Sequence, residues 1–164
     1  MALDDKDRQI ISVLQANGRI SNQDLSEAVN LSPSPCLRRL RMLERSGVIR
    51  GYTAIIDEEA FGLPVMAFVR IKLEVHNEAT VATFENAVRA IDAVLDCYVM
   101  TGSADYLLRV VVESLKDYET FVRLRIHTIP GIASIDSSFA YGSVKRLSAL
   151  PPLSAGHGGG ETSR

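Results

Sequence analysis

The sequence predicts an α+β protein in which a small all-helical unit with a short β wing precedes a unit of alternating strands and helices. Over about the first 50 residues, apolar residues recur at helical spacing, and Ser, Asp, Pro and Gly stand at the boundaries. From residue 64 onward, alternating and β-branched runs are separated by two further helical patterns. The expected organisation is a helical unit at 1–50, a β connector and linker at 51–63, a second folded unit at 64–150 and a disordered tail at 151–164.

Three short helices account for the N-terminal unit, and each has a residue suited to begin it. Asp4 and Ser21 precede the first two helices and provide side-chain oxygens that accept hydrogen bonds from the first turn. Ser32 does the same for the third, where Pro33 occupies the first helical position and its missing N–H loses no intrahelical bond. The expected helices cover residues 4–16, 21–29 and 33–45.

The third helix separates apolar from basic residues. At 100° per residue, one side carries Cys36, Leu37, Leu40 and Leu43, and a narrow band opposite carries Ser34, Arg38, Arg41 and Arg45. Between Pro33 and Tyr52 there are five arginines against one glutamate, a balance of +4, whereas the whole chain has a net charge of −2. A basic stripe on a slightly acidic chain favours a polyanionic partner, above all nucleic acid.

The rest of the chain alternates between strand and helix patterns. Residues 48–56 alternate enough for a short strand or pair of strands, which would form a wing or a connector. In the second unit the expected elements are strands at 65–75, 94–101, 106–113 and 132–144, with helices at 79–91 and 115–128. This β-α-β-β-α-β order is that of a ferredoxin-like sandwich, whose sheet has one face covered by helices and one face open. Because residues 107–112 carry apolar side chains on both faces, we expect a second subunit to cover the open face.

Several function classes are disfavoured by what the sequence does not contain. His76, His127 and His157 lie in separate segments, and neither Cys36 nor Cys97 has a base or a paired ligand beside it. We therefore expect no enzyme, no metal and no cofactor, and a structural role for both cysteines. The aliphatic strands lack the aromatic run of RNA-binding sheets. With no leader and no long apolar run, the expected location is the cytoplasm.

The second and third helices, joined by a tight turn at Asn30-Leu31, have the length and capping of a helix-turn-helix. In addition, the chain from about Leu3 to Leu150 resembles the Lrp/AsnC (leucine-responsive or feast/famine) transcriptional regulators. The motifs that carry the resemblance are Gly18-Arg-Ile-Ser-Asn, Asp24-Leu-Ser, Leu31-Ser-Pro-Ser-Pro-Cys-Leu-Arg-Arg, Gly47-Val-Ile-Arg-Gly-Tyr-Thr-Ala, Cys97-Tyr-Val-Met-Thr-Gly-Ser-Ala-Asp-Tyr-Leu-Leu-Arg and Ile129-Pro-Gly.

The resemblance implies a DNA-binding N-terminal domain and a C-terminal domain that dimerises and binds a small effector, usually an amino acid. It implies double-stranded DNA and further copies of the chain as partners, with assembly to tetramers or octamers. Genes of amino-acid metabolism or transport are the implied targets, and the nucleoid is the implied location. A broad-specificity, nucleoid-organising DNA-binding protein is the alternative, which differs mainly in its specificity ratio.

Candidate DNA contacts follow from the helix geometry. Ser34 and Arg38 are expected at base edges with Pro35 and Arg39 close by, and Arg41, Arg45 and Arg50 are expected mainly at phosphates. The alternative is that these arginines form only the solvated face of an exposed helix.

Candidate effector residues surround Gly102 and Asp105. Glycine lets a backbone approach a ligand closely, and a carboxylate can receive an ammonium group; alternatively the two residues only shape a hairpin turn. By motif, the resemblance places effector-response positions at Val99, Asp105, Leu115, Ser138, Phe139 and Ala140, of which Leu115, Phe139 and Ala140 could equally be interface residues. The candidate set is Val99, Met100, Thr101, Gly102, Asp105, Leu115, Ser138, Phe139 and Ala140. Its apolar lining with one acid favours leucine or another hydrophobic amino acid.

Overall fold

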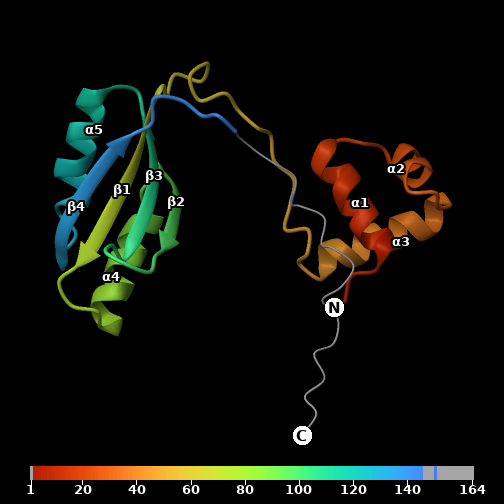
Figure 1. Cartoon of the computed structure of the whole chain (residues 1–164), viewed down its shortest axis with the longest axis horizontal. Helices are drawn as coiled ribbons and strands as arrows, with labels where there is room; N and C mark the ends of the chain where they lie inside the picture. The colour runs from red at the N-terminus through yellow and green to blue at the C-terminus, as the bar shows by residue number, and fades with distance from the viewer. Residues whose placement is uncertain (1, 146–149, 151–164) are drawn as a thin grey trace, which may run out of the picture. The chain divides into compact units, whose positions relative to one another are not determined.

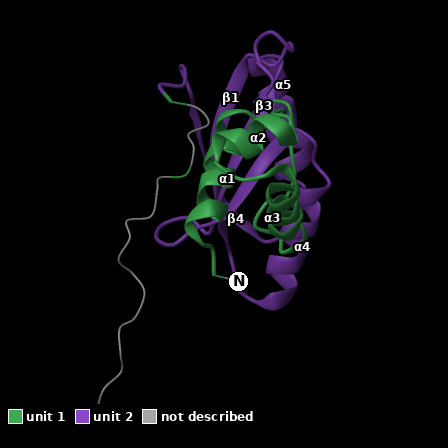
Figure 2. Ribbon diagram, turned by 90° about the vertical axis from the view of Figure 1, so that its right-hand side faces the viewer, with its two compact units in different colours: residues 1–54, 145–164 green, residues 55–144 purple. Residues whose placement is uncertain are grey.

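In the computed structural model, which describes residues 2–145 and 150, the chain forms two compact units. The division falls between Ala54 and Ile55, with the second unit running to Val144 (Figures 1 and 2). The disordered tail expected at 151–164 lies outside the described residues.

The first unit consists of α1 (Asp5–Ala16), α2 (Asn22–Ala28) and α3 (Pro33–Arg45). The Asp4 side chain caps α1 by accepting from the backbone of Asp7, and the Ser21 side chain caps α2 by accepting from the backbone of Asp24. The side-chain cap expected from Ser32 does not form, because Pro33 and Pro35 have no N–H to donate in the first turn of α3. Asn30 has a positive φ of 52°, which asparagine tolerates and which turns the chain from α2 into α3. The three helices bury one apolar core, formed by Ile10, Leu25, Val29, Cys36 and Leu43.

The expected β wing does not form as strands. Within the described residues, no strand is assigned between α3 and Val65. A strand needs a neighbour to accept its backbone hydrogen bonds, and the apolar residues of this segment, such as Ile55, remain exposed. Instead, the Ile49 N–H donates to the Leu43 carbonyl, and the Tyr52 hydroxyl donates to Glu44. The segment is therefore anchored to the end of α3 without a sheet.

The second unit has the expected β-α-β-β-α-β order and one four-stranded antiparallel sheet, with strands in the order β2-β3-β1-β4. Both helices contribute to one core on a single face of the sheet, where Phe84 and Tyr118 pack with Val69 and Leu108. The elements are β1 (Val65–Leu73), α4 (Glu78–Arg89), β2 (Val94–Val99), β3 (Tyr106–Val112), α5 (Leu115–Phe121), the π-helical turn η1 (Val122–Ile126) and β4 (Ile132–Phe139). The α+β, ferredoxin-like prediction is confirmed.

Within the second unit, two elements differ most from the sequence prediction. The single helix expected at 115–128 is split, because after Phe121 the chain widens into η1, where the His127 N–H donates to the Val122 carbonyl five residues back. The last strand ends at Phe139 rather than at residue 144. Its neighbour β1 begins at Val65, and the bond from the Ala140 N–H to the Met66 carbonyl already lies one residue from that end.

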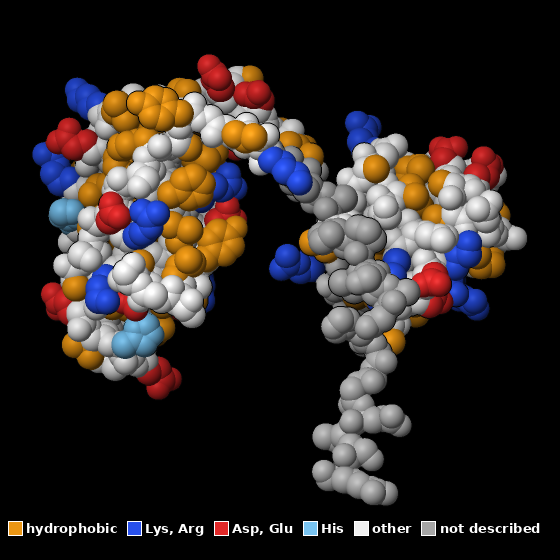
Figure 3. All heavy atoms as spheres, viewed as in Figure 1, with side chains coloured by type: hydrophobic (Ala, Val, Ile, Leu, Met, Phe, Trp, Pro, Cys, Tyr) orange, Lys and Arg blue, Asp and Glu red, His pale blue; other side chains and the backbone are white. Residues whose placement is uncertain are grey.

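The sheet face away from the helices carries both apolar and charged side chains. On β3, Leu107, Arg109 and Val111 alternate with the core residues of that strand and point to this face. Arg109 is paired there with Asp96 at 2.5 Å and with Glu58 at 3.6 Å. In Figure 3, hydrophobic side chains over this unit are interrupted by acidic and basic ones. This face is therefore less uniformly apolar than the β3 sequence alone indicates.

Candidate nucleic-acid interface and effector region

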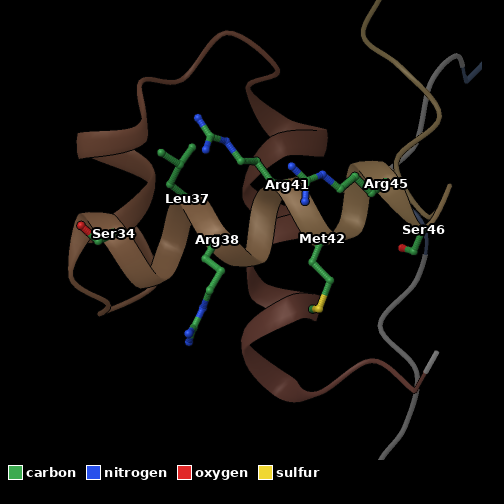
Figure 4. Close-up of a pocket in the computed structure, with 7 residues that line it drawn as sticks. All are labelled: Ser34, Leu37, Arg38, Arg41, Met42, Arg45 and Ser46. Atoms are coloured by element: carbon green, nitrogen blue, oxygen red, sulfur yellow. The ribbon is translucent and has the colours of Figure 1, made fainter.

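The outward face of α3 forms an open, basic groove along the helix (Figure 4). Positions three, four and seven apart fall on one side of a helix, so residues 34, 38, 41 and 45 share this face. Arg38 and Met42 extend to one side of the ribbon, and Leu37 and Arg41 extend to the other. The lining residues are Ser34, Leu37, Arg38, Arg41, Met42, Arg45 and Ser46.

The arginines of this groove are not used to hold the fold together. Arg38, Arg41 and Arg45 are exposed, and so is Arg50 just beyond the helix. Within residues 2–145, none of these four side chains makes a hydrogen bond or an ion pair with another side chain. Their donors are therefore available to a partner, and an Arg can offer two parallel donors to a guanine edge or a phosphate.

Arg39 is placed differently from the other arginines. Its Nη1 atom lies 2.6 Å from Asp4 Oδ2 and 2.8 Å from Asp7 Oδ1, so the side chain points toward the start of α1. A backbone hydrogen bond from Asp7, together with the Arg39 guanidinium, holds the pKa of the Asp4 carboxyl below its usual value. Arg39 was expected close to the base-contacting residues, and its Nη1 instead donates to two carboxylates of the same unit.

One residue expected in the core lines the groove instead. Cys36 and Leu43 are fully buried, whereas Leu37 is only partly buried and lies beside Ser34 and Arg38 on the outward face. Met42 also lies there, 39% exposed, although the sequence reasoning did not include it. Met42 lies one position after Arg41 and one helical turn after Arg38. The helical period of the sequence could therefore have indicated that Met42 lies on the groove face.

The segment after α3 holds Arg50 near the end of the groove helix. Tyr52 donates to Glu44 at 3.0 Å, and its ring lies within 3.8 Å of the position where a Cβ would stand on Gly18. Burial, and next the hydrogen bond to Glu44, raise the pKa of Tyr52. Arg50 lies between Ile49 and Tyr52, which are hydrogen-bonded to Leu43 and Glu44 of α3. These two bonds limit where the Arg50 side chain can reach.

In the second unit, the first group of candidate effector residues lies at the end of β2 and in the β2–β3 loop. Gly102 has a positive φ of 112°, and Val99, Met100 and Thr101 are exposed. The Asp105 carboxylate accepts from the backbone N–H of Leu73 at 2.8 Å, where the register of β1 shifts against β4. Its other oxygen lies 3.8 Å from His76 Nδ1, a neighbour that the sequence did not indicate. Asp105 therefore has a structural role at the end of β1, with one oxygen facing a partly open site.

The second group, Leu115, Ser138, Phe139 and Ala140, lies at the other end of the sheet. Phe139 pairs with Ala67, whereas Val99 pairs with Tyr106, which pairs with Ile71. The β1 partners of the two groups, Ala67 and Ile71, are four positions apart, which is about 13 Å along the strand. The Phe139 ring packs edge-on against Tyr118 with centroids 4.9 Å apart. A single chain therefore does not bring the two groups together.

The candidates for metal and thiol chemistry in the described part of the chain are its His, Cys, Asp and Glu side chains. Among these residues, no group of three or more His, Cys, Asp or Glu side chains could hold a metal ion. Burial raises the pKa of both Cys36 and Cys97, which disfavours their reactive thiolate forms. Over the same residues, no helix is long and apolar enough to span a bilayer.

Comparisons with known proteins cover both units. The family model described as "Winged helix-turn-helix DNA-binding" matches residues 3–50, and the one described as "Lrp/AsnC ligand binding domain" matches residues 66–150. The chain is 43% identical over 151 residues to the Bkd operon transcriptional regulator of Pseudomonas aeruginosa, covering 92% of this chain and 98% of that protein. It is 38% identical over 149 residues to the DNA-binding transcriptional activator DecR of Escherichia coli K12, covering 91% and 98%.

A solved structure is similar over the same extent. It is a transcriptional regulator from Neisseria meningitidis in complex with L-methionine, 38% identical, with a TM-score of 0.86 over 92% of this chain and 97% of that one. The similarity therefore extends over both units, including the helix that carries the basic groove.

Proposed function

Because the chain belongs to the Lrp/AsnC family of DNA-binding transcriptional regulators, we propose that it reads operator DNA through the outward face of α3 and responds to an amino acid bound by its second unit. The observation that carries the first half is the groove of α3, where three exposed arginines have no partner within residues 2–145. The genes of amino-acid metabolism or transport are the proposed targets, and the cytoplasmic nucleoid is the proposed location.

The position of each residue along α3 supports a division of roles. A recognition helix enters the major groove with its N-terminal residues at the base edges. Ser34, Pro35 and Arg38 occupy that end and are assigned to bases. Arg41 and Arg45 follow toward the C-terminal end, and with Arg50 they are assigned to phosphates, which hold the helix in place without reading sequence.

We assign the effector site to residues of the two groups at opposite ends of the sheet, with a second copy of the chain completing it. A free amino acid is shorter than the distance of about 13 Å that separates the groups along β1, so one chain alone cannot contact it with both. Asp105, with one oxygen free of the Leu73 bond, would receive the ammonium group, and Val99, Met100, Leu115 and Phe139 offer exposed apolar surface to the side chain. The L-methionine bound by the Neisseria relative supports a hydrophobic amino acid here.

Self-association is expected for two reasons: a second copy of the chain would complete the effector site, and two copies would bind DNA more tightly than one. The sheet face away from the helices carries half-buried Leu107 and exposed Tyr98, which a second subunit would cover. A single helix-turn-helix makes few phosphate contacts, whereas two copies joined at fixed spacing add their binding energies. We propose a homodimer that assembles further, with operators made of inverted half-sites.

Selection from a pool of random 30-base-pair duplexes by the full-length protein tests the DNA-reading half of the proposal. Enrichment of an inverted motif with half-sites about one or more helical turns apart is expected. If no sequence is enriched while binding remains tight, the protein binds DNA without reading it.

Calorimetry with leucine, methionine, lysine and glutamate tests the effector half. We expect leucine or methionine to bind more tightly than lysine and glutamate. No preference among the four would overturn the assignment of a hydrophobic amino acid.

A further inference from the structure

Arg39 lies next to Arg38 in sequence, but the two side chains serve different surfaces of the first unit. One step along a helix turns the side chain by 100°, so Arg39 leaves the groove face and reaches the N-terminal end of α1. Its Nη1 atom donates to Asp4 at 2.6 Å and to Asp7 at 2.8 Å. The guanidinium is partly buried, and the Asp7 side chain is only 3% exposed.

The two carboxylates that receive Arg39 are themselves held by the backbone of α1. Asp4 Oδ1 accepts from the Asp7 N–H at 2.9 Å, and Asp7 Oδ2 accepts from the Asp4 N–H at 3.2 Å. Each carboxylate thus uses one oxygen in the capping box of α1 and the other for Arg39. Arg39 therefore joins the middle of α3 to the start of α1 through two carboxylates whose positions are set by hydrogen bonds to the backbone.

Among residues 2–145, the directional contacts between α1 with its cap and α3, hydrogen bonds and ion pairs alike, all run through Arg39. The remaining contact between α1 and α3 is the apolar core around Ile10, Cys36 and Leu43. The start of α3 is also held by α2, because Asn22 Nδ2 donates to the Pro33 carbonyl at 3.1 Å. A small rotation of α3 would move Ser34 and Arg38 together relative to any bound base edge.

We propose that Arg39 is a positioning residue for DNA reading and not a DNA contact: its ion pairs with the capping box of α1 fix the rotation of α3 and thereby aim Ser34 and Arg38. This inference rests on the proposed DNA-reading role of α3. It also explains why a buried acid is present beside a DNA-binding helix, since Arg39 neutralises Asp7, which would otherwise be an unpaired buried charge.

Substitutions on both sides of the ion pair separate positioning from direct contact. Arg39→Gln removes both ion pairs, and Asp7→Asn removes the buried one while leaving the pair with Asp4. Asp4→Asn removes the more exposed pair and is the mildest variant, because asparagine is an equally good N-cap. Asp5→Asn and Arg8→Gln are matched controls: they remove the same charges from exposed positions of α1 that have no contact with Arg39. Far-UV circular dichroism establishes that each variant is folded before its DNA binding is compared.

The main readout is the ratio of affinities for the best selected duplex and for a random duplex. We expect Asp7→Asn and Arg39→Gln each to lower this ratio by about tenfold or more and Asp4→Asn by less, whereas the controls stay within about twofold. The salt dependence on random DNA should not change. The inference is overturned if Arg39→Gln weakens both duplexes equally and lowers the salt slope by about one per half-site, with Asp7→Asn leaving the ratio unchanged.

A second readout does not depend on DNA. Residual dipolar couplings of backbone amides report the orientation of α3 relative to α1, and we expect them to change in Asp7→Asn and Arg39→Gln but not in Asp5→Asn and Arg8→Gln. An unchanged orientation in the ion-pair variants overturns the inference. If instead the wild-type protein fails to discriminate any duplex, the proposed function fails, and the orientation measurement still decides the role of Arg39.

Discussion

Replacing Arg38 with alanine isolates the side chain assigned to base reading. Arg38 lies one turn after Ser34 in the outward groove and makes no bond with another side chain within residues 2–145, so its loss should change the free energy of unfolding by no more than about 0.5 kcal/mol. A bidentate contact to a base is worth about 1 to 3 kcal/mol, which is roughly 5- to 150-fold in affinity for each half-site. A dimer that uses both copies should therefore lose about 2 to 6 kcal/mol on its selected operator.

Fluorescence anisotropy with the selected operator and a random duplex, at several salt concentrations, measures this loss. Arg8→Ala is the control, because Arg8 is an exposed arginine on α1, away from the groove. We expect Arg38→Ala to weaken the operator complex far more than the random one and to relax base preference at one position of each half-site. Equal losses on both duplexes would show that Arg38 contacts phosphate and would refute the base-contact assignment.

Four further substitutions, the last of them a comparison for the third, test other residues. Arg45→Ala should weaken operator and random duplexes similarly and flatten the salt slope by about one per half-site, and a selective loss on the operator would contradict its phosphate role. Asp105→Asn keeps an oxygen for the Leu73 N–H but removes the charge, so calorimetry should find amino-acid binding reduced about tenfold or more with the thermal midpoint almost unchanged; unchanged binding would leave Asp105 only its structural role. Gly131→Ala should destabilise the fold by about 1 to 3 kcal/mol in urea, because φ is +84° and the new Cβ would stand 2.7 Å from Thr80 Cγ2. Gly47→Ala, with a φ of +74° and no atom within 4 Å, should cost less, and equal costs would refute the contribution of the Thr80 clash.

The helices of the first unit were predictable because their signals are local. Asp4 and Ser21 cap their helices through hydrogen bonds that span three residues, and the apolar spacing alone indicates the buried face. The order of strands and helices in the second unit was predictable for the same reason, since each element carries its own pattern.

Features that depend on distant partners were not predictable in this way. Whether the segment after α3 forms strands depends on a neighbour that the sequence does not specify, and the end of β4 depends on where β1 begins. The place of Arg39 depends on Asp4 and Asp7, which lie more than 30 residues earlier in the chain. Its identity as one of five clustered arginines gave no sign that it pairs inside the unit.

The candidate effector site illustrates the same limit. Motifs indicated residues near Asp105 and near Phe139, but only the strand register shows that these lie at opposite ends of the sheet in one chain. The neighbour His76 comes from the chain just after β1 and approaches Asp105 through the tertiary fold, so no spacing rule indicates it.

Footprinting of the full-length protein on the DNA upstream of its own gene, with and without each amino acid, tests the central claim most directly. We expect protected inverted half-sites spaced by about one or more helical turns, with the extent of protection changing in response to one hydrophobic amino acid. Uniform protection regardless of sequence would indicate a nucleoid-organising protein instead. Sequence-specific protection that no amino acid alters would contradict the proposed effector role of the second unit.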